Sequence, residues 1–378
     1  MSVNLSQTTS NKNPEQAETI SAMAKINDFL LRFSRIPLKE KLFFVQYLAV
    51  MLKAGITLSI ALKTLAKQTE NKRFNKILVE ISNNVQKGVN FTESLKPHKK
   101  IFGELFINMI EAGEISGKLE DVLGQLYIQM KKQHELISKI KGALTYPVVI
   151  MFAMGGIGIF MIVVIVPKIT IMFKEFQAEL PLPTKILIAV SDAIVNHGLL
   201  SVIALAVFIF IFIQILRNKK GEYYFQAIIL KLPIISPIIK KINLARFART
   251  ISSLLKTDIM IIKTFQITGD ILGNLHYRNA LIKMSEEIKK GGAIHEIIQN
   301  YPKLFPPVVT QMIAVGEETG ELDSILEELA EFYENEVNQI MNNLPSLIEP
   351  LLILILGCAV GAMAVAIIMP MYALTTAI

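Results

Sequence analysis

The residues that most suggest chemistry form a turn between two glycines, Gly113-Glu114-Ile115-Ser116-Gly117, followed by Lys118. A phosphate-binding loop has four residues between its glycines and a Ser or Thr after the lysine to hold Mg²⁺. Here three residues separate the glycines, and Leu119 follows the lysine. A second copy of the turn places Glu321 at the lysine position, and a carboxylate there would repel phosphate. The sequence therefore predicts a helix–turn–helix corner in which glycine permits positive φ, without a nucleotide.

Histidine–glutamate pairs beginning at His134 and His295 resemble the first half of the zinc-protease helix motif. That motif needs a second histidine one helical turn later, but Ser138 and Gln299 occupy those positions. Both pairs are typical of solvated helix faces. Because no Ser/His/Asp or Cys/His set stands out either, we predict no catalytic residues and no enzyme.

Adjacent carboxylates at Glu120-Asp121 and Glu317-Glu318 are the remaining candidates for metal ligands. No calcium-loop signature surrounds either pair. The single cysteine, Cys358, lies in an apolar run, which excludes a disulfide framework and a cysteine-based metal site. We therefore predict no metal and no cofactor.

The two polar turns belong to an internal repeat with an offset of about 203 residues, which runs without a gap from Phe44 to Pro167. The turn that begins at Gly113 returns at Gly316. Each copy ends in an apolar run between two prolines, which we predict to bound membrane helices: Pro147 and Pro167, then Pro350 and Pro370. The chain therefore consists of two polar modules, each joined to its own membrane helix.

Hydrophobic residues make up 52% of the 378 residues. Three stretches reach the roughly 20 apolar residues that a membrane-spanning helix requires, and their centres contain no Asp, Glu, Lys or Arg. Within the modules, apolar residues recur at helical spacing, and Asn90-Phe91-Thr92-Glu93 resembles a capping box. A long helix begins at Leu119, and no proline interrupts it before Pro147. It either continues into the first span or meets a separate helix at a proline kink.

These patterns predict an all-α integral membrane protein with two tandem cytoplasmic six-helix-bundle modules and three transmembrane helices. The expected boundaries are a disordered N-terminal tail at 1–36, module 1 at 37–146, the first span at 147–167, a periplasmic loop at 168–197, the second span at 198–216, module 2 at 217–349, the third span at 350–370 and a periplasmic C-terminal tail at 371–378.

Lysine and arginine placement predicts the orientation of the chain. Basic residues precede the first span and follow the second, whereas the 168–197 connection mixes both signs and the C-terminal tail is uncharged. We therefore expect both modules and the N-terminus in the cytoplasm and the C-terminus in the periplasm. The basic residues lie near the membrane without interleaved aromatics, which favours lipid contact over nucleic acid.

Charge also differs between the copies. Residues 317–336 contain nine acidic residues and no Lys or Arg, whereas the matching segment of the first copy contains Lys118, Lys131 and Lys132. One interpretation is a solvated face with basic residues near anionic lipid. The other is that the modules contact each other or a charged partner in a defined orientation. Because the turns are polar loops in both copies, we predict that they contact a partner through the following residues: Gly113, Glu114, Gly117, Lys118, Gly316, Glu317, Gly320 and Glu321.

From about Leu38 to its end, the chain resembles the platform proteins of type II secretion systems and type IV pilus machines, the GspF/PilC family. The resemblance lies in the tandem modules with three spans and the paired Gly-Glu-x-x-Gly turns. It also includes the basic-apolar approach to the first span, Lys139-Ile140-Lys141-Gly142-Ala143-Leu144-Thr145-Tyr146-Pro147.

This resemblance implies a non-enzymatic protein of the bacterial inner membrane. It implies that a hexameric cytoplasmic ATPase docks on the modules, and that ATP-driven movement of the platform lifts pilins or pseudopilins into a growing filament. Other inner-membrane components of the machine are expected partners. Glycines at 155, 156, 158, 357 and 361 give the spans small-residue faces, which are compatible with packing within a chain and with a homo-oligomer. The alternative is a repeat-built transporter or channel, but no span carries a central ionisable residue.

Overall fold

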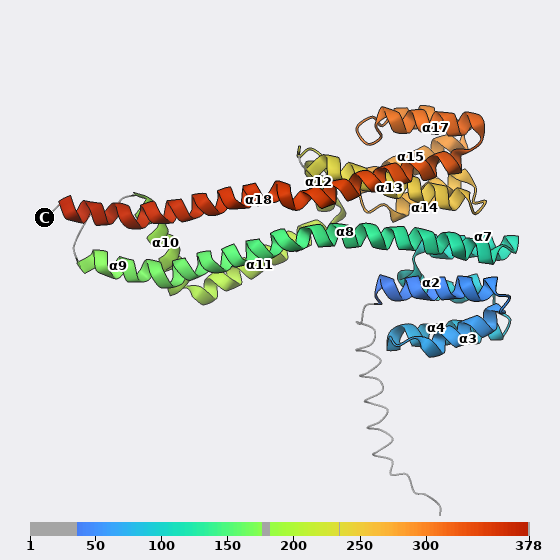
Figure 1. Ribbon diagram of the computed structural model, residues 1–378, viewed down its shortest axis with the longest axis horizontal. Coiled ribbons are helices and arrows are strands. Elements are labelled where there is room, and N and C mark those ends of the chain that lie inside the picture. The colour runs from blue at the N-terminus through green and yellow to red at the C-terminus, as the bar shows by residue number, and fades with distance from the viewer. Residues whose placement is uncertain (1–35, 176–181, 234, 377–378) are drawn as a thin grey trace, which may run out of the picture. The chain divides into compact units, whose positions relative to one another are not determined.

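The computed structural model describes residues 36–175, 182–233 and 235–376, and every regular element within them is a helix. This confirms the predicted all-α class. By internal contacts the chain divides into two compact units, residues 1–131 with 256–259 and residues 132–255 with 260–378. Figure 1 shows the elements coloured along the chain. The predicted tail, residues 1–36, lies outside the described residues apart from Ile36.

The first unit contains the helices of module 1. Helix α2 ends at Lys53, and Gly55 with φ 80° turns the chain. The next helix starts directly after Thr57. The bounds are α2 Leu38–Lys53, α3 Leu58–Gln68, α4 Lys72–Gln86, α5 Phe91–Leu95, the 3₁₀ turn η1 Lys96–His98, α6 Lys99–Phe102, α7 Glu104–Ser116 and the start of α8 Leu119–Phe160.

Three buried phenylalanines form the centre of this unit. The ring of Phe44 on α2 lies 5.7 Å from that of Phe74 on α4 and 6.2 Å from that of Phe102 on α6. The Phe74 and Phe102 rings are 6.1 Å apart. Offset and edge-on aromatic pairs at such distances add to the stabilisation from apolar burial. The cluster therefore joins helices that are far apart in the sequence.

The second copy of the repeat folds in the same way. Its aromatic centre is Phe247, Tyr277 and Phe305, with ring distances of 5.0 Å between Phe247 and Phe305 and 5.5 Å between Tyr277 and Phe305. Its helices are α13 Ile235–Leu255, α14 Ile261–Ile271, α15 Leu275–Lys289, α16 Ile294–Gln299, α17 Pro307–Thr319 and α18 Leu322–Thr376. The starts of α14, α15, α17 and α18 match those of α3, α4, α7 and α8 at the repeat offset.

The same N-cap also recurs. The side chain of Asn71 accepts hydrogen bonds from the N–H groups of Arg73 and Phe74 at the start of α4. Asn274 does the same for His276 and Tyr277 at the start of α15. An asparagine in this position satisfies donors that the helix itself cannot pair. The repeat therefore extends from the sequence to individual hydrogen bonds.

Three described helices are long and apolar enough to cross a membrane. They are α8, α11 Gly198–Arg217 and α18, and Figure 1 shows α18 as one unbroken helix. Outside their apolar parts, α8 and α18 pack together through Leu136, Val337, Met341 and Leu344. Both helices pass through a proline, Pro147 in α8, as the continuous-helix alternative predicts.

Beyond Phe160 the first span widens into a π-helical segment, Met161–Ile165, and continues as α9, Val166–Glu175. The N–H of Val166 donates to the carbonyl of Met161, five residues earlier, so in this register Pro167, which has no N–H, leaves the carbonyl of Ile162 without a backbone donor. The hydroxyl of Ser191 donates to that carbonyl at 2.7 Å instead. Such side-chain replacement allows proline within an apolar helix.

The connection predicted at 168–197 is largely helical where the structure describes it. It contains the rest of α9 and a further helix, α10 Leu182–Asn196. An apolar run within α10 and the Ser191 contact favour a packed helix over an irregular loop. After α11, the short helix α12, Lys219–Ile229, leads into module 2. The side of the membrane on which each connection lies stays a prediction.

Candidate functional site

The second glycine of each predicted turn ends a helix. Gly117 has φ 71° after α7, and Gly320 has φ 76° after α17. This left-handed conformation is strained for residues with a side chain and common for glycine directly after a helix. The structure thus confirms the predicted helix–turn–helix corners.

The first glycine of each turn is required by close packing. A Cβ at Gly113 would lie 2.9 Å from the Cβ of Val122, and one at Gly316 would lie 3.0 Å from the Cα of Leu322. Both glycines are buried. The short turn folds α8 back onto α7, and α18 back onto α17, at distances that leave no space for a methyl group.

The glutamate of the first turn caps a neighbouring helix. Glu114 accepts hydrogen bonds from the N–H groups of Phe91 at 2.7 Å and Thr92 at 3.0 Å, at the start of α5. Helix starts carry unpaired N–H groups and a partial positive charge, and a carboxylate satisfies both. The side chain of Glu114 is therefore engaged within its own module.

Glu317 makes the equivalent cap in the second copy and adds a titratable partner. It accepts from the N–H of Ile294 at 2.6 Å and of His295 at 3.1 Å, and it lies 2.7 Å from Nδ1 of the His295 ring. Burial alone would raise the pKa of Glu317, but these hydrogen bonds outweigh it and lower the pKa. The hydrogen bond to Glu317 in turn raises the pKa of His295 above its ordinary value.

The predicted capping box at Asn90-Phe91-Thr92-Glu93 was wrong in its partners. A helix does start at Phe91, but the Asn90 side chain makes no capping hydrogen bond. Glu93 pairs with Lys96 instead. The backbone donors are already satisfied by Glu114, whose carboxylate offers two acceptor oxygens from α7.

The remaining turn residues face outward. The side chain of Ile115 is 83% exposed, which is unusual for a large apolar residue. Lys118 lies 3.1 Å from Oδ2 of Asp258 within the first unit, and both side chains are largely exposed. Glu318 and Glu321 are exposed in the second copy. Partner contact through these turns stays a prediction. A partner would contact these exposed side chains.

Part of the acidic segment in the second copy forms ion pairs within its unit. The guanidinium of Arg249 on α13 contacts both carboxylate oxygens of Glu334 on α18, at 2.8 and 2.9 Å. Lys132 lies 3.4 Å from the same carboxylate, and Lys241 pairs with Glu336. Glu327 also lies 3.4 Å from Arg249. The acidic segment thus holds α13, α18 and α8 together rather than being only a solvated face.

No group of three or more His, Cys, Asp or Glu side chains among the described residues is arranged to bind a metal. Among those residues, neither Glu120-Asp121 nor Glu317-Glu318 therefore has a third ligand of this kind beside it. Glu317, one member of the second pair, is occupied as a helix cap.

The family model described as type II secretion system protein F matches the chain twice, at residues 44–167 and 247–370. The chain belongs to this family. The two matched segments coincide with the two copies of the repeat. They include both glycine turns and all four prolines predicted to bound the spans.

This chain has relatives with two kinds of name. It is 36% identical over 336 residues to the type IV pilus assembly protein PilC of Thermus thermophilus, covering 89% of this chain and 82% of the relative. It is 32% identical to PilC of Myxococcus xanthus, covering 92% and 83%. It is 29% identical to the type II secretion system protein F of Aeromonas hydrophila, covering 93% and 90%.

The capping role of the two glutamates was missed in the sequence. Glu114 and Glu317 act on backbone donors more than 20 residues earlier, which no local periodicity reveals. A signal is present nonetheless, because Glu114 in the first copy and Glu317 in the second lie at the same distance from a helix start. The recurrence by itself predicts a helix–turn–helix corner and a partner contact, and it does not show which backbone donors the glutamates cap.

Proposed function

We propose that this chain is a platform protein of the bacterial inner membrane that couples a cytoplasmic assembly ATPase to filament assembly. The relatives' names, which refer to type IV pilus assembly and type II secretion, support a place in one of these two machines. In this role the protein catalyses no reaction. Its modules receive a displacement, and its spans pass that displacement to pilins or pseudopilins in the membrane.

The observation that carries this proposal is the continuity of α8 and α18. Each begins at a glycine corner of a module and extends without interruption into an apolar span. Their packing through Leu136, Val337 and Met341 makes them move together near the membrane. An uninterrupted helix transmits displacement along its axis, whereas a break would absorb it.

The expected partners follow from this geometry and from the family. A hexameric ATPase would meet the modules, pilins or pseudopilins would meet the spans, and further copies of the chain would complete a homo-oligomer. Both modules would face the cytoplasm with the ATPase, the N-terminus would lie on the same side, and the C-terminus would lie in the periplasm. The basic residues beside the first two spans support that orientation.

Gly142 offers a test of coupling through α8. It lies in the helix just before the apolar part, and a Cβ there would contact nothing within 4 Å. Gly142→Pro interrupts the helix, and Gly142→Ala is the matched control that preserves it. We expect the proline variant to insert into the membrane at normal levels yet assemble no filament and secrete no substrate. Normal assembly by the proline variant contradicts coupling through α8.

The partner of the turns is testable separately with a photo-crosslinking residue at Ile115 and at Glu318, its equivalent in the second copy. Both positions are exposed and leave the capping glutamates intact. We expect the assembly ATPase to be captured in living cells, and its identity would show which machine the chain serves. Capture of only a second copy of this chain would contradict ATPase contact at the turns.

A further inference from the structure

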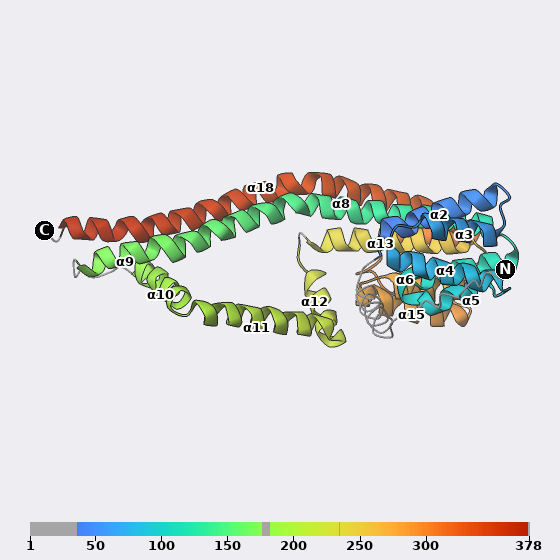
Figure 2. The same cartoon turned by 90° about the horizontal axis from the view of Figure 1, so that it is seen from below.

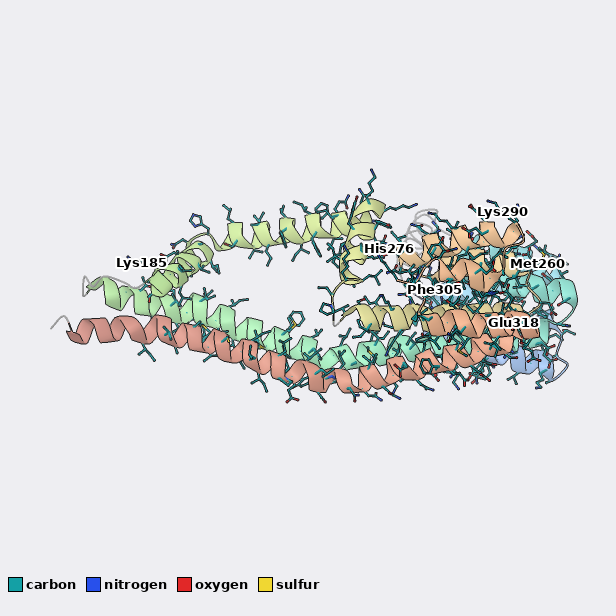
Figure 3. All side chains as sticks on the ribbon, turned by 90° about the horizontal axis from the view of Figure 1, so that it is seen from above. Lys185, Met260, His276, Lys290, Phe305 and Glu318 are labelled. Carbon is teal, nitrogen blue, oxygen red and sulfur yellow. The ribbon has the colours of Figure 1, made fainter. Side chains whose placement is uncertain are left out.

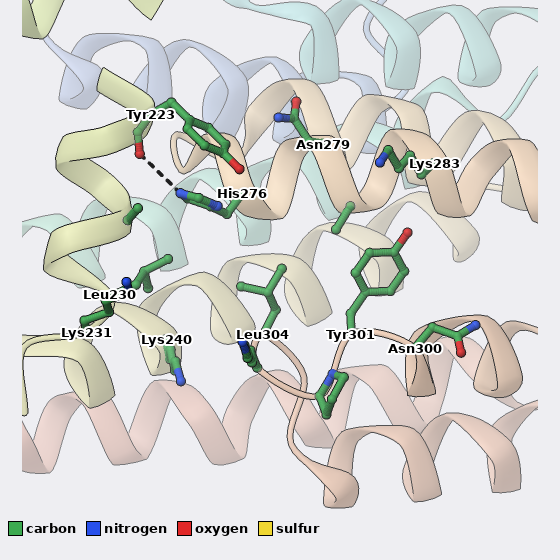
Figure 4. Close-up of a pocket in the computed structure, with 14 residues that line it drawn as sticks. Tyr223, Leu230, Lys231, Lys240, His276, Asn279, Lys283, Asn300, Tyr301 and Leu304 are labelled. Atoms are coloured by element: carbon green, nitrogen blue, oxygen red, sulfur yellow. Dashed lines mark hydrogen bonds between the residues drawn. The ribbon is translucent and has the colours of Figure 1, made fainter. Parts of the chain in front are cut away.

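A cavity of about 540 Å³ opens in the second unit beside the end of the second span. It lies between α12, the starts of α13 and α15, and the segment that joins α16 to α17 (Figure 4). Its polar lining consists of basic residues, tyrosines and two asparagines, with no Asp or Glu. The basic and aromatic residues are Lys231, Lys240, Lys283, Lys303, His276, Tyr223 and Tyr301.

The four lysines have no ion-pair partner among the residues that the structure describes. Apolar groups of Ala227, Leu230, Ala280 and Leu304 form much of the rest of the lining. Lys231, Lys283 and Lys303 are exposed and Lys240 is half-buried, so the four charges are solvated and together make the opening of the cavity attractive to an anion. The geometry therefore fits a ligand with an anionic group and an apolar part.

The first copy of the repeat carries an acidic residue at one of these basic positions. Lys283 occupies the position of Glu80, and Tyr301 occupies that of His98. In the first copy, Oε2 of Glu80 lies 3.3 Å from Nε2 of His98, so that an acidic side chain and an imidazole occupy the site. In the second copy the acidic side chain is replaced by a basic one.

Helix α12 forms the wall of the cavity nearest the end of the second candidate span. One residue, Asn218, separates it from α11, and a Cβ at Gly221 would lie 2.1 Å from the carbonyl oxygen of Ile215, so α12 is folded tightly against α11. The rings of Phe212 and Phe225 meet edge to face at 6.3 Å. Figure 2 shows α12 running across the direction of α11. This orientation is that of a helix lying along the membrane surface.

The outer face of α12 has the composition of an interfacial helix. Tyr224 is 68% exposed and Ile228 is 60% exposed, and Lys219 and Lys220 begin the helix. Amphipathic helices with aromatic and basic residues bind at the boundary between headgroups and acyl chains. The cavity therefore opens where phospholipid headgroups are found.

Module 2 holds α12 in this position. The amide of Gln226 donates to the carbonyl of Gly273 at 3.2 Å and accepts from the N–H of Leu275 at 2.7 Å. The ring of His276 lies 4.2 Å from that of Tyr223, and its Nε2 lies 3.3 Å from the Tyr223 carbonyl. Figure 3 labels His276 at the end of α15 that meets α12. These contacts hold the α12 wall of the cavity against the start of α15.

We propose that this cavity binds the headgroup phosphate of an anionic phospholipid, with the acyl chains lying along the exposed apolar faces of α11 and α12. The lysines supply the attraction for the phosphate, and the tyrosine hydroxyls supply hydrogen bonds to the glycerol oxygens. Bound lipid would join module 2 to the membrane next to the second span. A soluble phosphate compound shares the headgroup chemistry but would leave the apolar lining and the exposed face of α12 unused.

The test uses the purified full-length protein and native mass spectrometry. Phosphatidylglycerol and phosphatidylcholine with identical acyl chains are titrated into the detergent-solubilised chain, and the retained lipid is counted. We expect phosphatidylglycerol to be retained at lower concentration. Since a lysine near a membrane surface contributes roughly fivefold to anionic lipid binding, Lys240→Gln with Lys283→Gln should weaken that retention at least tenfold.

Lys290→Gln with Lys289→Gln is the matched control, because these lysines lie at the opposite end of α15 and do not line the cavity. Equal loss of lipid in the control and cavity variants overturns the proposal. Displacement of the lipid by millimolar glycerol 1-phosphate would also overturn it in favour of a soluble anion.

Because the chain contains no Trp, Tyr224→Trp gives a single tryptophan on α12, whose emission can be excited separately from that of the tyrosines. Quenching by brominated phospholipid is expected, and its absence overturns the interfacial placement.

Discussion

Single residues of the glycine turns perform three different structural tasks. In the first copy, Gly113 allows two helices to approach, Glu114 caps a third helix and Gly117 adopts a left-handed conformation. The motif therefore specifies the shape of the corner, independently of any partner. Substitutions that preserve this shape test the predicted contact surface, and substitutions that alter it test the corner itself.

Replacing Glu317 with Gln should destabilise module 2. The amide has one acceptor oxygen in place of two and no negative charge, so at least one of the two backbone donors at the start of α16 loses its partner. Hydrogen bonds to charged groups contribute about 1.5–3 kcal/mol. We expect a lower Tm for the detergent-solubilised full-length protein. Glu318→Gln, at the exposed neighbouring position, is the control and should leave the Tm unchanged.

The His295–Glu317 pair should make stability depend on pH. Because the folded state raises the pKa of His295 above 6.5, its contribution is fully present below pH 6.5 and is lost as the pH rises through the raised pKa. The difference in Tm between the wild type and His295→Asn should therefore shrink from pH 6 to pH 9. The first copy has Thr92 at the equivalent position, so Thr92→Ala should show no such dependence. A constant difference for His295→Asn would contradict the pair.

Replacing Gly113 with Ala should also lower the Tm. The new methyl group would meet the Val122 side chain and lie 3.2 Å from the Cα of Leu119, so the α7–α8 corner must open. Overpacking of this kind costs about 1–3 kcal/mol. Gly124→Ala is the matched control, because that glycine lies within α8 with open space around it. An equal or smaller effect at Gly113 would show that the corner is not closely packed.

At the scale of elements, ion pairs between α13 and α18 replace apolar packing at one place. The Arg249 side chain is 6% exposed and that of Glu334 is 12% exposed. Removing one member of a buried pair leaves the other without a partner and costs roughly 3 kcal/mol, whereas replacing both with apolar residues is often neutral. The pair therefore sets how the two helices align as well as how strongly they associate.

Arg249→Met should lower the Tm markedly, and Arg249→Met with Glu334→Leu should recover most of the loss. The measurement is thermal unfolding of the solubilised chain at neutral pH and fixed ionic strength. Arg278→Met is the control, since its ion pair with Asp270 is substantially exposed and should contribute little. Failure of the double variant to recover would show that the charges are needed for more than their mutual pairing.

Most elements could be predicted from the sequence because they depend on local patterns. Apolar periodicity indicated that both modules are helical, the long helix was expected from Leu119, and the repeat offset gave the correspondence between the copies. Contacts across long sequence separations could not be predicted. The hydroxyl of Ser191 satisfies the carbonyl left unpaired by Pro167, and no pattern around either residue indicates the other. The Glu114 cap and the Arg249 pair were missed for the same reason.

At the scale of the whole molecule, the continuity of α8 and α18 shows that the repeated unit is a module together with its long helix. Each copy contributes one module and one helix that extends from it into the membrane. A further candidate span, α11, lies between the two copies in the sequence. Motor coupling requires α11 to return the chain to the side that α8 leaves, because both modules must meet one cytoplasmic ATPase, and the orientation of the termini becomes the central prediction.

Cysteine labelling can decide that orientation, because Cys358 is the only cysteine. In a Cys358→Ser background, single cysteines replace Ile115 in module 1 and Thr376 near the C-terminus. A membrane-impermeant maleimide should label the Thr376 position in intact spheroplasts and the Ile115 position only after permeabilisation. Lysine placement beside the spans predicts this pattern. The reverse pattern would place both modules outside the cytoplasm, where no ATP-driven motor could reach them, and would contradict motor coupling.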